Sequence, residues 1–133
     1  MANTYSQIHI MTVWAVKFRE GLIHPQWKES LYQYITGIVQ QRGNKLLRIN
    51  GMPDHVHLFF GMKPNECLSK LMQEVKENSS KWINKEGLCP GRFAWQDGYG
   101  AFSYSHSQIH DVVQYIIHQE AHHRKRSFLE EYQ

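Results

Sequence analysis

Two histidines separated by one residue, His55 and His57, are the side chains in this sequence best suited to bind a metal ion. They lie in the run DHVHLFF, whose composition favours a β-strand. Because side chains alternate across a strand, both imidazoles project from one face. Two histidines leave coordination positions open for a third ligand, water and a phosphate oxygen. The pattern indicates a catalytic metal site, although two ordinary strand histidines remain the alternative.

Tyr115 is a candidate nucleophile because it stands among apolar helix residues without sharing their stripe. At about 100° per residue, Tyr115 lies roughly 130° from the centre of that stripe, which predicts a tyrosine outside the core. Gln119 follows one turn later on the same flank. A phenol attacks a phosphodiester if a cation neutralises the developing charge, and His55, His57 and Gln119 would hold that cation. A solvent-exposed tyrosine without a role is the alternative.

Strands and helices must position these residues, and their order follows from hydrophobic spacing and turn residues. Strands are expected over 5–19, 45–51 and 54–62, with a broken strand, or a strand after a glycine-rich turn, within 93–105. Helices are expected from Pro25 to Gly43 and from Pro64 to Lys85. Ser107 is expected to cap a third helix. Its apolar stripe consists of Ile109, Val112, Val113, Ile116 and Ile117.

The order strand, helix, strand, strand, helix, strand predicts an α+β fold of the ferredoxin-like kind. A four-stranded antiparallel sheet would carry two helices on one face. The third helix would then be an addition that carries the tyrosine. The length of 133 residues suits a single domain over 1–133.

Composition limits the possible partners and compartments. A net charge of +3 permits a phosphate-bearing partner without requiring one. Two cysteines, Cys67 and Cys89, do not suggest a disulfide framework. The first residues lack the features of a secretory signal, and no apolar run reaches the roughly 20 residues of a membrane helix. We therefore expect a cytoplasmic protein with no membrane partner.

Several motifs together resemble those of the single-tyrosine HUH transposases, the IS200-like family of the 200/605 group of insertion sequences. Besides DHVHLFF, these are INGMPDHVH, KENSSKWIN on the second helix, WQDGYGAFSYS after it and YIIHQEAHH on the third helix. The resemblance covers nearly the whole chain. It implies a ferredoxin-like homodimer that cleaves single-stranded DNA at hairpin-marked element ends. It also implies Mg²⁺ or Mn²⁺ dependence, a 5′-phosphotyrosine intermediate with a free 3′-OH, and no nucleotide cofactor.

Carried over by position, the resemblance makes His55 and His57 the metal ligands of the HUH motif, Tyr115 the nucleophile and Gln119 the third ligand. In the family, the tyrosine helix often completes the site of the partner subunit. The chain departs from the family at His118, where asparagine is more usual.

A DNA-binding surface is expected on the second helix and at the end of the third. The candidate contacts are Lys76, Ser79, Ser80, Lys81 and His122, with a solvated helix face as the alternative for each residue of the second helix. Aromatic residues of the run 93–105 would either stack on unpaired bases or fill the core.

Three other interpretations remain open. His118, His122 and His123 would form a second metal site if their rings converged, although a solvated His118 is the simpler expectation. A metal hydrolase that uses water would need the histidines and not Tyr115. A DNA-binding module of the same fold that no longer cuts would need neither the metal ion nor the nucleophile.

Overall fold

The computed structural model describes residues 4–119 and has the predicted order of strands and helices. Its strands are β1 (His9–Ala15), β2 (Lys45–Met52), β3 (His55–Gly61) and β4 (Gly100–Tyr104). Its α-helices are α1 (Pro25–Gln41), α2 (Leu68–Glu86) and α3 (Ile109–Ile117). Two short 3₁₀ helices, η1 (Lys17–Arg19) and η2 (His106–Gln108), follow β1 and precede α3.

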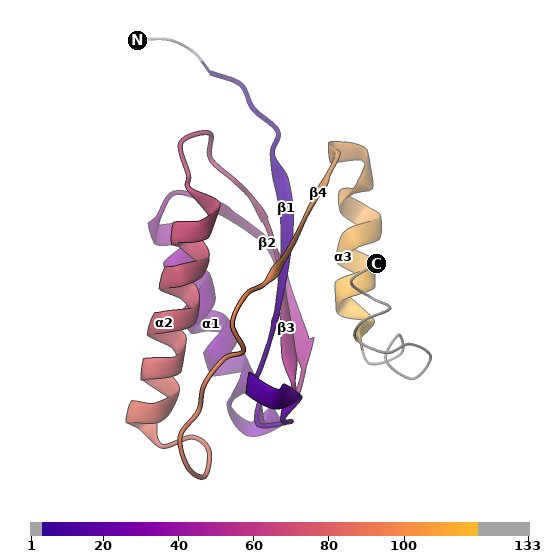
Figure 1. Ribbon diagram of the computed structural model, residues 1–133. Coiled ribbons are helices and arrows are strands. Elements are labelled where there is room, and N and C mark those ends of the chain that lie inside the picture. The colour runs from indigo at the N-terminus through magenta and orange to yellow at the C-terminus, as the bar shows by residue number, and fades with distance from the viewer. Residues whose placement is uncertain (1–3, 120–133) are drawn as a thin grey trace.

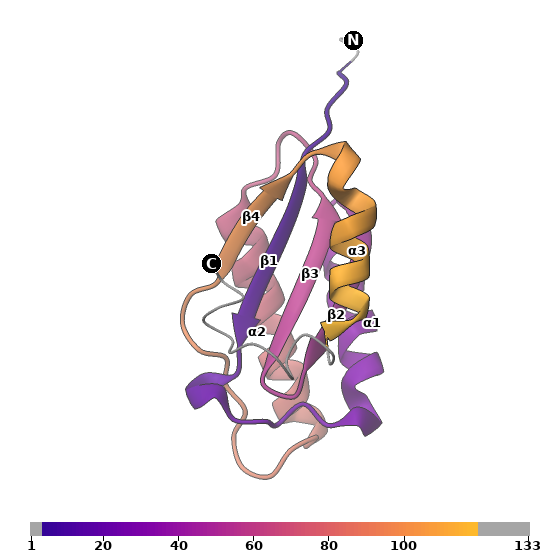
Figure 2. The same cartoon turned by 90° about the vertical axis from the view of Figure 1, so that its right-hand side faces the viewer.

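The four strands form one antiparallel sheet of order β2-β3-β1-β4, so β3 and β1 are its central strands. Helices α1 and α2 cover one face of the sheet, and α3 covers the other (Figures 1 and 2). This arrangement confirms the predicted α+β, ferredoxin-like fold with an added C-terminal helix.

The larger core lies between the sheet and helices α1 and α2. From β3 it receives Val56, Leu58 and Phe60, which alternate with the residues that face α3. Trp14 of the neighbouring strand β1 is fully buried in the same core. Because helices cover both faces of the sheet, residues of the central strand β3 are buried on both faces and read as a nearly continuous apolar run.

Strand β1 is shorter than the sequence predicts, because the chain leaves the sheet after Ala15. The backbone N–H of Val16 donates to the carbonyl of Asp54 at 2.8 Å, and that of Lys17 donates to the carbonyl of Ala94 at 3.0 Å. The next residues form η1 in place of the predicted continuation of the strand to Arg19.

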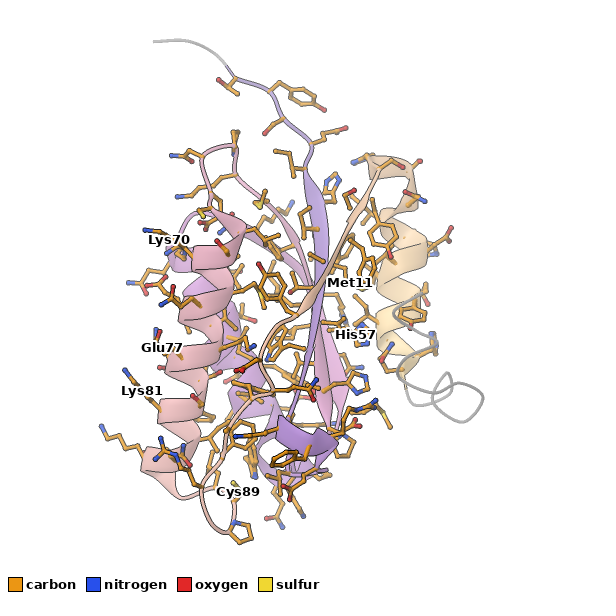
Figure 3. All side chains as sticks on the ribbon, in the orientation of Figure 1. Met11, His57, Lys70, Glu77, Lys81 and Cys89 are labelled. Atoms are coloured by element: carbon orange, nitrogen blue, oxygen red, sulfur yellow. The ribbon has the colours of Figure 1, made fainter. Side chains whose placement is uncertain are left out.

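Helix α2 begins at Leu68 and not at Pro64, because Pro64 lies in the turn that follows β3. It ends at Glu86, and Gly87 adopts the left-handed conformation that a helix C-terminus favours. Lys70, Glu77 and Lys81 point away from the sheet (Figure 3). No helix within residues 4–119 is both long and apolar enough to cross a membrane.

The end of α1 is tied to the turn before α2 by a group of charged and polar side chains. Arg42 donates to both carboxylate oxygens of Glu66 and to Glu74. Asn44 also donates to Glu66, at 2.7 Å. The Arg42 hydrogen bonds lower the pKa of Glu66 to about 2, which outweighs the opposing effect of burial.

We expect Glu66→Gln to lower the free energy of unfolding near neutral pH by about 1–3 kcal/mol, because Arg42 and Asn44 lose a charged acceptor. The folded-state pKa of Glu66 is below its ordinary value of 4.5, so its contribution exists above that value and is lost as the pH falls toward 2. Urea unfolding across this range should therefore show the difference between the two proteins shrinking with acid. Glu74→Gln, which changes the more exposed partner of Arg42, is the matched control and should have a smaller effect.

Candidate active site

His57 lies on β3 and faces α3, on the side of the sheet opposite α1 and α2 (Figure 3). His55, two residues earlier on the same strand, lies on the same face. Their exposed fractions are 0% and 2%, and their ring centroids are 5.1 Å apart. Across the sheet, His57 pairs with Val13 of β1 and Asn50 of β2. Strand alternation thus brings both imidazoles into one buried layer beneath the third helix.

Asp54 fixes the orientation of the His55 ring. Its Oδ1 lies 2.7 Å from His55 Nδ1, while Arg19 Nε and Nη2 donate to Oδ2 at 3.0 and 2.6 Å. Burial would raise the pKa of Asp54, but the hydrogen bonds from His55 and Arg19 outweigh it and hold this pKa at about 2. An ionised carboxylate only accepts hydrogen bonds, so the Nδ1–H of His55 donates to it. The other ring nitrogen, Nε2, is then the one that would bind a metal ion.

Sequence analysis did not single out Asp54 or Arg19. Asp54 directly precedes the histidine pair, and that position was a usable signal for a carboxylate that orients a ligand. Arg19 is 35 residues away in sequence from Asp54. Only the fold brings it to the site, through the turn that ends β1.

Helix α3 is held on the sheet by a second, smaller core. Val112 and Ile116 of the helix pack with Met11 of β1 and Phe59 of β3. Figure 3 shows Met11 and His57 on the same side of the sheet, facing this helix. The predicted stripe therefore contributes to a real core, although with a different orientation of the helix.

The third helix begins differently from the prediction that Ser107 caps it. Ser105 occupies the N-cap of η2, and its backbone N–H donates to Gln108 Oε1 at 2.9 Å in a capping box. Helix α3 then continues from Ile109. The cap shifts by two residues because a 3₁₀ turn precedes the α-helix.

Tyr115 is half-buried and lies beside His57; it packs against the second core without belonging to its buried set, so it is less exposed than the sequence predicts. Its ring centroid is 5.8 Å from that of His57, in an edge-on arrangement, and it packs against the second core. The helix is rotated by roughly 60° from the direction of the predicted stripe. As a result Val112 and Ile116 face the sheet, while Ile117 is 36% exposed.

Gln119, two residues beyond the end of α3, is fully buried beside the same histidines. Its Oε1 lies 3.4 Å from His55 Nε2, and its Nε2 donates to the carbonyl of Tyr115 at 3.5 Å. Within residues 4–119, no three His, Cys, Asp or Glu side chains converge as a metal-binding group. The third potential ligand is the amide oxygen of Gln119, a residue type outside those four.

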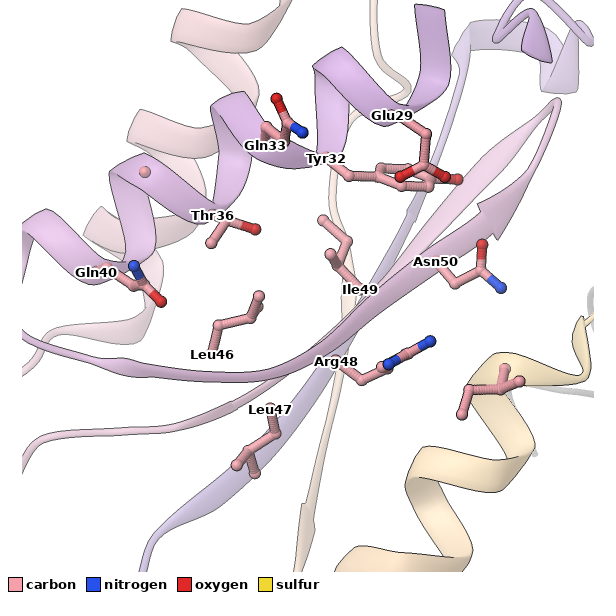
Figure 4. A pocket seen from close by; sticks show the side chains of 12 residues that line it. Glu29, Tyr32, Gln33, Thr36, Gln40, Leu46, Leu47, Arg48, Ile49 and Asn50 are labelled. Carbon is pink, nitrogen blue, oxygen red and sulfur yellow. The ribbon is translucent and has the colours of Figure 1, made fainter.

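Asn50 connects this site to a groove on the neighbouring surface. Its Nδ2 donates to the carbonyl of Ile116 at 3.0 Å, which ties the last turn of α3 to β2. The groove has a volume of about 650 Å³ and lies between α1 and β2 (Figure 4), and Ile117 of α3 also lines it. Asn50 and Tyr32 are among the side chains that line it.

The residues expected to contact DNA on α2 do not join the histidine site, because α2 lies on the other face of the sheet (Figure 1). Lys81 is exposed, whereas Lys76 is half-buried and donates to the carbonyls of Gln96 and Gly98 at 2.8 Å each. Ser80 donates to the carbonyl of Glu77.

Ser79 is fully buried, and its Oγ accepts a hydrogen bond from Trp95 Nε1 at 2.9 Å. The sequence expectation that Ser79 contacts DNA is therefore withdrawn, because its hydroxyl faces the core. Trp95 itself packs on Trp14 and Phe93. For Trp95, this favours a role in the core over stacking on DNA bases.

Two of the three histidines considered for a second metal site, His122 and His123, lie outside the described residues. The expectation that His122 contacts DNA therefore also falls outside the described residues. His118 is exposed, and its Nδ1 lies 2.8 Å from the carbonyl of Gln114.

The fold is similar to the folds of two solved structures described as transposases. A crystal structure of a Deinococcus radiodurans protein described as a transposase superposes with a TM-score of 0.68 at 22% identity, covering 90% of this chain and 96% of the other. A REP-associated tyrosine transposase bound to a REP hairpin also gives a TM-score of 0.68, at 14% identity, covering 92% of this chain and 73% of the other.

Sequence comparison then identifies the family. The model of the family described as Transposase IS200 like matches residues 4–119, so the chain belongs to this family. Among characterised relatives, the ISDra2 transposase TnpA of Deinococcus radiodurans is 25% identical over 116 residues. That alignment covers 83% of this chain and 82% of the relative. The resemblance inferred from the motifs is confirmed.

We expect Asn50→Ala to loosen the last turn of α3, because the carbonyl of Ile116 loses its donor. A neutral hydrogen bond contributes about 1 kcal/mol, so overall stability should fall only slightly. Amide hydrogen exchange at the end of α3 should become faster, while exchange in β3 stays unchanged. Gln33→Ala, which removes an exposed amide on the far wall of the same groove, is the control. Equal protection of α3 in both variants would contradict this role for Asn50.

Proposed function

We propose that this protein cleaves and rejoins single-stranded DNA at hairpin-marked element ends, with Tyr115 as the nucleophile. The observation that carries the proposal is the convergence at one place of the Tyr115 phenol, the His57 ring and the Gln119 amide oxygen. Tyr115 is 5.8 Å from His57 between ring centroids, and Gln119 Oε1 is 3.4 Å from His55 Nε2. Membership of the transposase family supports the same chemistry.

His55, His57 and Gln119 fit a divalent metal ion, for which we propose Mg²⁺ or Mn²⁺. Two imidazoles and an amide oxygen are a mixed nitrogen and oxygen donor set with positions left for water and phosphate. The hydrogen bond between His55 Nδ1 and Asp54 directs the other ring nitrogen toward Gln119 Oε1. When bound, the ion would neutralise charge on the phosphate and so lower the barrier to attack.

In the proposed reaction, the Tyr115 oxygen attacks a phosphorus of the DNA backbone. A bond forms between this oxygen and phosphorus, and the bond from phosphorus to the 3′ oxygen breaks. The phenolic proton is given up, and the departing 3′ oxygen takes one up, which leaves a 3′-OH and a 5′-phosphotyrosine. Attack by a 3′-OH on the phosphotyrosine reverses these changes and joins the strands. No nucleotide cofactor is required, because the phosphotyrosine bond replaces the broken phosphodiester bond and retains its energy for the rejoining step.

A structured DNA hairpin is the proposed partner outside the cleavage site. A related tyrosine transposase was solved with a REP hairpin, which supports a hairpin ligand for this chain. We keep Lys76, Ser80 and Lys81 as proposed DNA contacts on α2. Lys81 is exposed, with its Nζ 3.9 Å from Glu77 Oε1, and would contact phosphate, whereas Lys76 would act mainly by holding the backbone at Gln96 and Gly98.

We also propose that the protein works as a homodimer, as its family resemblance implies. Tyr115 contacts His57 of the same chain in the described arrangement. This contact favours attack by the tyrosine of the chain that supplies the histidines.

We expect Tyr115→Phe to abolish the covalent adduct with single-stranded hairpin DNA while retaining DNA binding. The protein is incubated with labelled DNA and Mg²⁺ or Mn²⁺, and adducts are resolved on a denaturing gel. Tyr104→Phe is the matched control, because Tyr104 is another half-buried tyrosine of the same small core. It should form the adduct at a rate within a few-fold of the unmodified protein.

The alternatives give different results in the same experiment. Cleavage that survives in Tyr115→Phe would indicate a hydrolase that uses water. Binding without adduct or cleavage in the unmodified protein, across the element-end sequences, would favour a DNA-binding module that no longer cuts.

We expect Asp54→Asn to weaken binding of Mn²⁺ alone by about 10–100-fold, because the amide no longer holds the His55 ring as an anionic acceptor does. Titration calorimetry without DNA measures this affinity well below the melting temperature. Asp111→Asn, at an exposed carboxylate in the first turn of α3, is the control and should leave the affinity unchanged. Unchanged affinity in both variants would contradict the proposed role of Asp54.

A further inference from the structure

Phe18 is presented to solvent next to the candidate active site. It lies in η1, directly after β1, and 78% of its surface is exposed. Isolated exposed aromatic residues are common and need no explanation. Phe18 differs from these in its backbone, its neighbours and its position.

The backbone at Phe18 adopts a conformation that bulky residues avoid. Phe18 has φ 59° and the following Arg19 has φ 57°, so two successive non-glycine residues are left-handed. Such residues are strained and persist only where surrounding contacts hold them. Strain of this kind gathers at ligand-binding sites, so the conformation points to a function for the exposed ring.

Hydrogen bonds on both sides hold this turn. The N–H of Lys17 donates to the carbonyl of Ala94 at 3.0 Å, and that of Arg19 donates to the carbonyl of Val16 at 2.8 Å. The Arg19 side chain donates to Asp54. Phe18 is therefore a fixed projection and not part of a loose loop.

Asp54 connects the turn to the histidines. One carboxylate oxygen accepts from Arg19 and the other lies 2.7 Å from His55 Nδ1. Two residues, Arg19 and Asp54, thus separate Phe18 from His55. Figure 2 shows η1 at the same end of the sheet as the start of β3.

We propose that Phe18 is a stacking platform for an unpaired base of the single-stranded DNA, adjacent to the scissile phosphate. This inference rests on the proposed function and adds a binding subsite to it. A base offers a flat π-face to an exposed ring whatever its sequence. Lys17 Nζ lies 5.4 Å from the centre of the Phe18 ring, so a cation stands beside the platform where a backbone phosphate would pass.

The other aromatic candidates are less suited to this role. Trp95 is 8% exposed and packs in the larger core, while Phe102 packs against the smaller core. Tyr5 is as exposed as Phe18 but precedes β1, at the opposite end of that strand.

The test compares binding of a short oligothymidylate to Phe18→Ala and to Tyr5→Ala, the matched exposed aromatic away from the site. Loss of one stacking contact should weaken binding in Phe18→Ala by about 5–150-fold, which corresponds to about 1–3 kcal/mol per base. Tyr5→Ala should bind like the unmodified protein. Circular dichroism and Mn²⁺ affinity, which should be unchanged in both, separate a lost contact from a damaged site.

A second variant gives a direct signal. In Phe18→Trp, the indole should retain binding, and its fluorescence should be quenched when oligothymidylate is added. Equal binding by Phe18→Ala and the unmodified protein, or an unquenched indole at saturating oligonucleotide, would overturn the proposal. The Tyr115 adduct assay is independent: an adduct formed normally by a Phe18→Ala protein with unchanged DNA affinity would refute the platform and leave the cleavage function standing.

Discussion

The alternation of side chains along β3 is the constraint on which the rest of the structure depends. Val56, Leu58 and Phe60 enter the core under α1 and α2, while His57 faces α3 and His55 lies beside Gln119 at the end of that helix. A slip of one residue in the pairing would exchange these two sets and bury the histidines in the wrong layer. Gly51 in β2 helps to fix the register, because a Cβ there would lie 2.2 Å from the carbonyl oxygen of His55. The hairpin thus specifies both the core and the site.

The site has one part on the well-packed strand β3 and another part on α3, which a small core holds against the sheet. The histidines belong to a central strand paired on both sides, and Asp54 lies in the turn directly before it. Tyr115 and Gln119 come from α3 and its end, which the small core under Val112 and Ile116 and one hydrogen bond from Asn50 hold in place. Local stability follows the amount of buried apolar contact. Tyr115, the proposed nucleophile, is therefore attached to the less stable part of the fold.

Hydrophobic spacing was sufficient to predict the order of elements, because each helix and strand buries a face with its own period. It could not predict how α3 is rotated. Five apolar residues suggested a stripe centred between Ile109 and Val113, but Phe59 and Met11 select Val112 and Ile116, and this brings Tyr115 toward His57. The histidine spacing was a local signal and could be interpreted directly. The Arg19 contact is a product of tertiary structure alone.

Burial of the proposed metal ligands has a consequence for how DNA would reach the site. His55 and His57 are 0% and 2% exposed, so a phosphate cannot contact either ring in the described arrangement. Both rings project from the sheet toward α3, and the Tyr115 ring lies against that of His57. Access then requires displacement of α3 or of the Tyr115 side chain. The small core under α3 makes this the least costly movement near the site, whereas a shift of β3 would disrupt pairing with two strands and the larger core.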